Sequence, residues 1–201
     1  QEIFSRDELI DHFSLDDVGE SSAVFDEEKL LWLNHEWMKR KDPEELGRLF
    51  RDFLIGTEGA TKEQLDSLGD SRLTELARQL RERNRTLVQM AESGEFVFTE
   101  DLDYESTSIY DYLTEENQKL VGDLGQELEV LSEEDFHAEN LEEVTRDFLA
   151  ERDSGLGDIA QVCRIGLTGR EVSPGLFITM ELVGQQKVAN RLARVSKLEL
   201  S

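Results

Sequence analysis

Two groups of basic residues are the part of this 201-residue sequence whose chemistry suggests a ligand. The first group consists of Arg78, Arg81, Arg83 and Arg85, which follow one another closely. A guanidinium group donates several hydrogen bonds in a planar fork that matches phosphates and the edges of nucleobases. These arginines therefore either contact a nucleic acid or form the solvated face of a helix.

The second group is Arg164 and the turn-rich stretch that follows it, residues 167–177. A loop that enters a capped helix exposes backbone N–H groups beside a basic side chain, which suits phosphates or base edges. We expect Ser173 to cap this helix and Pro174 to be its first residue. An exposed Pro174 or Leu176 would pack against an unstacked base. The alternative is a capping turn beside a solvated helix.

No catalytic motif accompanies these groups. The sequence has no glycine-rich phosphate loop, no nucleophile elbow and no His-Glu-x-x-His. Its three histidines, His12, His35 and His137, lack the spacing of metal ligands. The single cysteine, Cys163, excludes an internal disulfide, and we expect it to be a small buried hydrophobe. We therefore expect no catalytic residue, metal or cofactor in this chain.

The net charge of −24 argues at first against binding a polyanion. The charge is distributed unevenly, because residues 95–143 hold 17 acidic residues and one basic residue. Residues 72–85 and 161–201 each have a net charge of +3. A nucleic-acid contact is therefore expected from these two stretches. The acidic segment favours an alternative, an all-helical interaction module for a basic protein partner, and high-salt adaptation is a further hypothesis for the acidic excess.

The elements that must position these groups are predicted to be helices. Capping boxes begin at Ser5 and Thr61, Asp26 precedes an apolar stripe, and Pro43 suits the first turn of another helix. From residue 73 to residue 88 the apolar residues recur about every 3.6 positions, which predicts one continuous helix. The fold class is all-α.

That continuous helix would separate the arginines. At about 100° per residue, Arg78, Arg81 and Arg85 fall on one flank of the apolar stripe, and Arg83 and Arg72 fall on the other. Only one of Arg81 and Arg83 is then expected to point into a given site.

We predict two consecutive helical-bundle subdomains, residues 1–103 and 104–201, with the boundary near Tyr104. Residues 96–101 are predicted to be a short extended piece before it. Thr114 and Ser132 are expected N-caps of acidic helices. Downstream, three cations are spaced to form one basic stripe along the last helix: Lys187, Arg191 and Arg194.

The composition argues against a membrane protein. No apolar run approaches the roughly 20 residues of a membrane span, and no basic and apolar signal peptide is present. We expect a soluble, cytoplasmic protein. The first residue is Gln1 rather than methionine, which indicates a processed or excised chain.

Several of these segments resemble the region after the catalytic domain of bacterial-type glutamyl-tRNA synthetases. The resemblance extends through the whole chain in order and is most specific near the C-terminus. Its segments are residues 13–18, 22–26, 29–34, 98–101, 156–161, 167–169, 173–177 and 182–184, with Arg164.

The resemblance implies two helical subdomains that bind the anticodon arm of tRNA(Glu). In the family, an arginine that aligns with Arg83, rather than its neighbour Arg81, helps read the third anticodon base. The first base and its neighbour meet a loop that matches Arg164, Ser173, Pro174 and Leu176. Three further matches are positions near the tRNA-facing surface: Trp32, Lys39 and Arg40.

The resemblance also implies a parent enzyme, a class I glutamate–tRNA ligase. Its catalytic domain, which would bind ATP and Mg and glutamylate the tRNA, is absent from this sequence. We expect a monomeric parent, and whether it also accepts tRNA(Gln) is left open. Replacement of Arg83 or Arg164 by alanine is expected to weaken tRNA binding without altering thermal stability.

Overall fold

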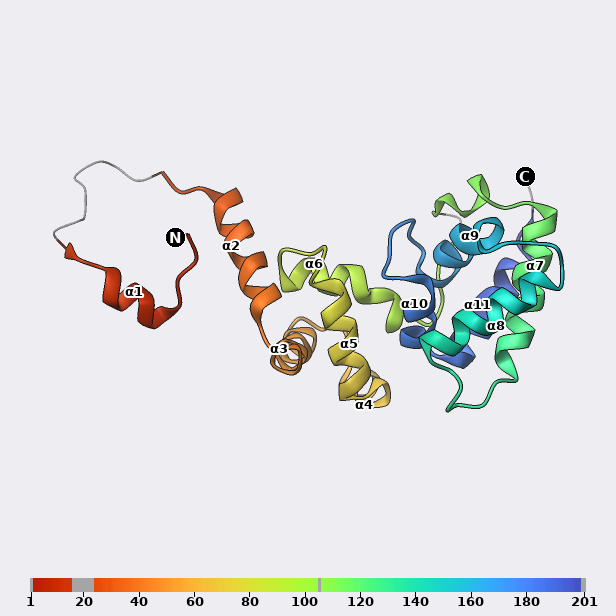
Figure 1. Ribbon diagram of the computed structural model, residues 1–201, viewed down its shortest axis with the longest axis horizontal. Helices are drawn as coiled ribbons and strands as arrows, with labels where there is room; N and C mark the ends of the chain where they lie inside the picture. The colour runs from red at the N-terminus through yellow and green to blue at the C-terminus, as the bar shows by residue number, and fades with distance from the viewer. Residues whose placement is uncertain (1, 16–23, 105, 200–201) are drawn as a thin grey trace.

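A computed structural model describes residues 2–15, 24–104 and 106–199. Within these ranges the chain forms eleven α-helices and no β-strand, which confirms the all-α prediction. The molecule is elongated, with α1 (Arg6–His12) at one end (Figure 1). Two further groups of helices follow it along the long axis. They run from α2 (Glu27–Arg40) to α6 (Leu87–Gly94) and from α7 (Glu115–Glu129) to α11 (Gln185–Val195).

The predicted helix starts are confirmed for the first group. Ser5 and Thr61 form complete capping boxes, Asp26 accepts a hydrogen bond from the Lys29 N–H, and Pro43 is the first residue of its helix. These caps satisfy backbone donors that have no partner within the helix. The remaining helices of this group are α3 (Pro43–Gly56), α4 (Lys62–Leu68) and α5 (Asp70–Leu80).

The second group is built on the close packing of α7 against α11. Gly122 allows this approach, because a Cβ atom there would lie 2.6 Å from Ser196 Cβ. Around this pair lie α8 (Ala138–Ala150), α9 (Leu156–Thr168) and α10 (Leu176–Val183). The buried hydrophobic residues form one cluster that runs from Met38 to Val195. The division at residue 103 therefore stays a prediction.

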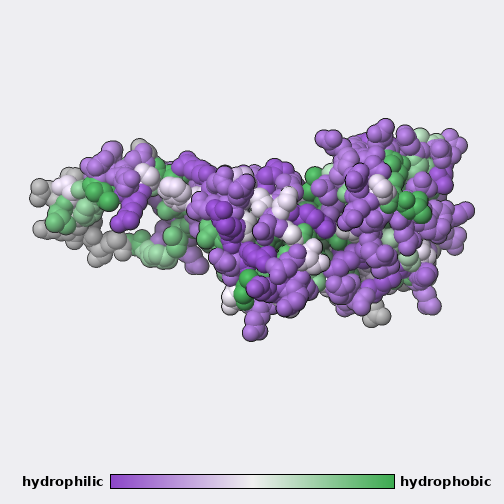
Figure 2. All heavy atoms as spheres, turned by 90° about the horizontal axis from the view of Figure 1, so that it is seen from below, coloured by the Kyte–Doolittle hydropathy of each residue, from purple (hydrophilic) through white to green (hydrophobic). Residues whose placement is uncertain are grey.

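Helix α1 differs from the others because it buries no residue. Apolar side chains near it and at the start of α2 are exposed, among them Phe13, Val24 and Phe25. Figure 2 shows hydrophilic residues over most of the visible face, with hydrophobic patches at the end that holds α1 and also farther along the molecule.

The prediction of one continuous helix through residues 73–88 is wrong. Helix α5 ends at Leu80, and α6 begins at Leu87 after a turn. The side chain of Asn84 donates to the Leu80 carbonyl at 2.8 Å, and Thr86 caps α6 by accepting from the Gln89 N–H. These side chains satisfy the backbone groups at the break, which the apolar periodicity alone does not reveal.

Two predictions about short segments are also wrong. Residues 96–101 are not extended, because Glu95–Val97 form a 3-10 helix closed by the Phe98 N–H on the Glu95 carbonyl. Ser132 closes a single turn by accepting from the Asp135 N–H and caps no helix. Helix α8 begins later, with His137 as its N-cap. Thr114 caps α7 as predicted.

None of the helices in the described ranges is long and apolar enough to cross a membrane.

Candidate nucleic-acid interface

The turn of residues 81–86, here the 81–86 turn, presents its arginines in different directions. Arg81 folds back, and its Nη1 donates to the Lys41 carbonyl at 2.9 Å. The Arg81 carbonyl lies 2.9 Å from Nε2 of His35, so this residue ties the turn to α2. Arg83 is exposed, and its Nη1 donates to the Ser173 carbonyl at 3.0 Å. The turn thus separates the two arginines more completely than opposite flanks of a helix would.

The loop of residues 169–175, here the 169–175 loop, faces this turn. It leaves α9 at Gly169, whose φ of +70° is a left-handed conformation that glycine adopts without strain. Thr168 stabilises the exit, because its Oγ1 donates to the Arg164 carbonyl and accepts from the Arg170 N–H. The loop ends where α10 begins at Leu176.

Arg164 holds the loop from within. Its Nη1 donates to Ser173 Oγ at 2.7 Å, to the Pro174 carbonyl at 2.9 Å and to the Ser173 carbonyl at 3.3 Å. Arg83 and Arg164 therefore share one acceptor, the Ser173 carbonyl. Burial lowers the pKa of Arg164, and the nearby positive charge of Arg83 lowers it further. An arginine remains charged despite such shifts, so two cations lie close together here.

The expected helix start at Ser173-Pro174 is wrong. Helix α10 begins two residues later, with Gly175 as its N-cap. Ser173 Oγ is not available as a cap, because it accepts from Arg164 and donates to the Pro174 carbonyl. The first bond into the helix runs from the Thr179 N–H to the Gly175 carbonyl.

A pocket of about 580 Å³ lies between the turn and the loop. The volume is within the range of small-molecule sites, and the lining is mixed polar and apolar. Val172, 66% exposed, is an apolar residue at this pocket. The lining residues are Gln79, Leu80, Glu82, Arg83, Asn84, Ser93, Arg170, Glu171, Val172, Ser173, Pro174 and Gly175.

Of the residues singled out from the sequence, Arg83, Ser173 and Pro174 line this pocket. Arg164 does not line the pocket but donates to Ser173 and Pro174, which do. Leu176 does not present an exposed surface, because only 6% of it is accessible and it packs in the core as the first residue of α10. Pro174, which is half-buried, Val172 and the buried Leu80 are the apolar side chains that line the pocket.

The residues of α2 lie elsewhere: Trp32, Lys39 and Arg40 do not line the pocket. Trp32 is half-buried, Arg40 is exposed, and Lys39 forms an ion pair with Glu36 at 2.5 Å. Their helix does support the site, because Asn34 donates to the Arg85 carbonyl at 2.5 Å. An ion pair between Glu28 and Arg85 adds a second link from α2 to the 81–86 turn.

The cations expected to form a basic stripe on the last helix are bonded to other parts of the chain. Arg191 is 2% exposed, and Lys187 and Arg194 form ion pairs with Glu100 and Asp101 at 2.8 and 2.6 Å. All three side chains face the segment of residues 95–102. The buried Arg191 is therefore not part of a solvated helix face, whereas Arg194 is exposed despite its ion pair.

Sequence reasoning gave no role to Asn84 and Ser93 of the pocket, and it placed Arg170 only within the stretch of residues 167–177. Arg170 donates to the Glu92 carbonyl at 2.8 Å, and Asn84 Oδ1 accepts from Ser93 Oγ at 2.9 Å. The Thr86-x-x-Gln89 spacing was the available signal, since it marks a helix start that breaks the long periodicity. In the described part of the chain, no group of histidine, cysteine or acidic side chains is arranged to hold a metal ion. Cys163 is buried, as predicted.

Comparison with known proteins identifies the family. The sequence profile of the family described as "Anticodon binding domain" matches residues 45–196. The chain belongs to this anticodon-binding domain family. The anticodon-binding region inferred from the sequence is thereby confirmed.

Similar proteins with curated names are glutamate–tRNA ligases. The enzyme of Thermodesulfovibrio yellowstonii is 36% identical over 195 residues, which are 97% of this chain and 41% of that protein. The enzyme of Geobacter sulfurreducens is 32% identical over 194 residues, 96% of this chain and 40% of that protein. The chain thus spans about two fifths of the length of these relatives.

The fold is also found in solved structures. A crystal structure of a glutamate tRNA ligase from Elizabethkingia meningosepticum, in complex with its amino acid, has a TM-score of 0.83 and 22% sequence identity. The match covers 100% of this chain and 38% of that one. A glutamate-tRNA synthetase from Elizabethkingia anophelis matches with a TM-score of 0.77 and 21% identity. At this level of identity the likeness shows a common fold.

Proposed function

We propose that this chain is the anticodon-recognition region of a glutamyl-tRNA synthetase and binds the anticodon loop of tRNA(Glu). The observation that supports the proposal is the convergence of Arg83 and Arg164 on the Ser173 carbonyl beside a pocket. Two cations at a backbone acceptor, with a mixed polar and apolar lining, suit an unstacked base and its phosphate. The family membership favours this function over an acidic protein-interaction module.

The two arginines have different roles in this proposal. Arg83 is exposed and donates through Nη1 to the Ser173 carbonyl, so its Nε and Nη2 would donate to the third anticodon base. Arg164 is half-buried and holds the loop that meets the first base and its neighbour. Ser173 and Pro174 supply the loop backbone, and Leu176 anchors the loop from the core instead of touching a base.

The wider setting is part of the same proposal. Residues 1–103 and 104–201 would be two consecutive anticodon-binding subdomains, with Trp32, Lys39, Arg40 and Arg81 close to the bound tRNA. The rest of a monomeric cytoplasmic parent enzyme would bind ATP and Mg and glutamylate the tRNA. Acceptance of tRNA(Gln) depends on how strictly Arg83 reads the third base.

The test is a binding titration of this chain with the anticodon stem–loop of tRNA(Glu), repeated across salt concentrations. Arg83→Ala is expected to weaken binding about tenfold or more, because a bidentate arginine contact contributes roughly 1–3 kcal/mol of discrimination. Changing the third anticodon base should weaken RNA binding by the unaltered chain but have little further effect on RNA binding by Arg83→Ala.

The matched control is Arg78→Ala. Arg78 is an exposed arginine of α5 that pairs with Glu75 and does not line the pocket, so its loss leaves affinity nearly unchanged. Absence of binding at every ionic strength would refute the proposal and favour the protein-interaction module.

A further inference from the structure

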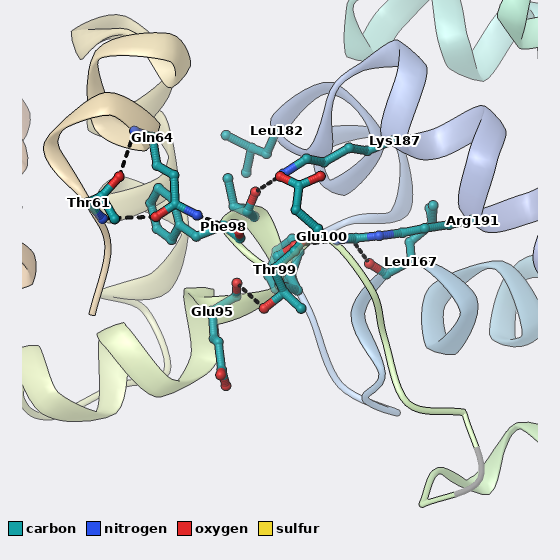
Figure 3. Close-up of polar contacts among 12 residues, drawn as sticks. Thr61, Gln64, Glu95, Phe98, Thr99, Glu100, Leu167, Leu182, Lys187 and Arg191 are labelled. Carbon is teal, nitrogen blue, oxygen red and sulfur yellow. Dashed lines mark hydrogen bonds and ion pairs between the residues drawn. The ribbon is translucent and has the colours of Figure 1, made fainter. Parts of the chain in front are cut away.

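The segment of residues 95–102 is held between two helices that are far apart in sequence. On one side Gln64 of α4 donates to the Phe98 carbonyl at 2.9 Å (Figure 3). On the other side Arg191 Nη2 donates to the carbonyls of Phe96 at 2.9 Å and Thr99 at 2.6 Å. Lys187 adds a bond to the Val97 carbonyl at 3.2 Å. The segment therefore cannot shift relative to α11 without breaking several hydrogen bonds.

Arg191 also reaches the helix that leads to the loop. Its Nη1 donates to the carbonyl of Leu167 at 2.6 Å, near the end of α9, where the 169–175 loop begins (Figure 3). The segment of residues 95–102 follows α6, which follows the 81–86 turn. One guanidinium thus joins the two backbones that lead to opposite sides of the pocket.

The burial of this group argues for a geometric role. Arg191 is 2% exposed, its Nε has no partner, and burial lowers its pKa. Taking a cation out of water is costly, and an apolar side chain of similar length often gives equal or better stability. A planar guanidinium, however, fixes three carbonyls at set angles, which neither an apolar chain nor a flexible ammonium does.

We propose that Arg191 is a positioning residue, which sets the separation of the 81–86 turn and the 169–175 loop and so places Arg83 against Ser173. Arg191 acts through these segments and touches no ligand. The effect on RNA binding rests on the proposed function, whereas the effect on the separation does not.

The separation can be measured without RNA. Spin labels at Glu82→Cys and Val172→Cys, both exposed at the pocket, report it by electron paramagnetic resonance. The buried Cys163 stays unlabelled, because burial raises the pKa of its thiol to about 12. In the otherwise unaltered chain we expect one narrow distance distribution. Arg191→Met broadens or displaces it while the helical circular dichroism is retained, and Arg191→Lys gives an intermediate result.

A matched control is Arg152→Met. Arg152 also donates to a backbone carbonyl, that of Phe148, but the two residues are only four apart at the C-terminal end of α8, so this variant keeps the narrow distribution. A narrow, unshifted distribution in folded Arg191→Met would overturn the proposal. If Arg191→Met does not fold, Arg191→Lys decides the matter, and an unaltered distribution in that variant overturns the proposal equally.

A measurement of RNA binding distinguishes the positioning role of Arg191 from the proposed anticodon-binding function. We expect Arg191→Met to bind the anticodon stem–loop about tenfold more weakly, because small misplacements of binding groups cost large factors in affinity. Arg152→Met should bind normally. A changed separation with no RNA binding by any form of the chain supports the positioning role and refutes the proposed function.

Discussion

Each of the two basic stretches has a net charge of +3, but Arg83 in the first and the cations of α11 in the second have different structural roles. In residues 72–85 the last turn leaves Arg83 exposed at a pocket. In residues 161–201 the cations of α11 are directed at backbone carbonyls and carboxylates of the same chain. Local net charge therefore does not identify a nucleic-acid surface. What decides is how far the packing of distant segments encloses the cation with acceptors, because Arg83 bonds to one carbonyl and stays exposed, whereas Arg191 bonds to three and is buried.

The comparison predicts the largest loss of stability for Arg191→Ala. Three carbonyls would lose their donor and a cavity would replace a buried side chain, so we expect a loss of about 3–5 kcal/mol in the free energy of unfolding. Urea denaturation measures it. Arg146→Ala, which removes an exposed ion pair within α8, should lose less than about 0.5 kcal/mol. Equal losses in the two variants would show that Arg191 has no special role.

A smaller loss of stability is expected for Arg164→Ala, because Arg164 is half-buried, between the buried Arg191 and the exposed Arg83. Arg164 holds Ser173 and Pro174, so the structure replaces the expectation of unaltered stability with a loss of about 1–2 kcal/mol and weaker RNA binding. Arg83→Ala should weaken binding at nearly constant stability. Thermal unfolding and RNA titration of both variants test this. Identical stability of the two variants would contradict the distinction.

The dependence of binding on salt sharpens the comparison further. Because the α11 cations are occupied within the chain, only about one or two phosphates should be neutralised, giving a slope of log K against log[salt] near −1. Titrations of the stem–loop at several salt concentrations give this slope. A slope steeper than about −3 would mean that further cations leave their internal partners on binding.

The smallest change in the free energy of unfolding is expected at alkaline pH, from the buried hydrogen bond between Tyr104 and Gly166. Tyr104 donates to the Gly166 carbonyl at 2.7 Å, and burial raises the pKa of its hydroxyl, opposed by Arg194 and Arg191. The unfolded tyrosine ionises near pH 10, so its contribution is complete below about pH 10 and is lost as pH rises through the higher folded pKa. Unfolding measured across this range should show a decline that Tyr104→Phe lessens. An equal decline in the unaltered chain and in Tyr104→Phe would contradict a role for Tyr104 ionisation.

Local signals in the sequence predicted the helices well where a cap and an apolar stripe coincide. Ser5, Asp26, Thr61 and Thr114 each cap a helix as expected, because the capping side chain and the backbone N–H that donates to it lie within four residues of one another. The sequence failed where the partner is distant. Ser173 caps no helix because Arg164 takes its hydroxyl, and no spacing rule relates these two residues.

The sequence by itself therefore determined the all-α class, most helix starts, the buried state of Cys163 and the family, since all of these depend on residue order and short-range bonding. Only the tertiary structure decided which cations remain exposed. Arg83 and Arg191 have the same side chain, yet one is exposed at a pocket and the other is enclosed by three carbonyls. A guanidinium exchanges water for carbonyl acceptors only where the packing of distant segments brings those acceptors within hydrogen-bonding distance.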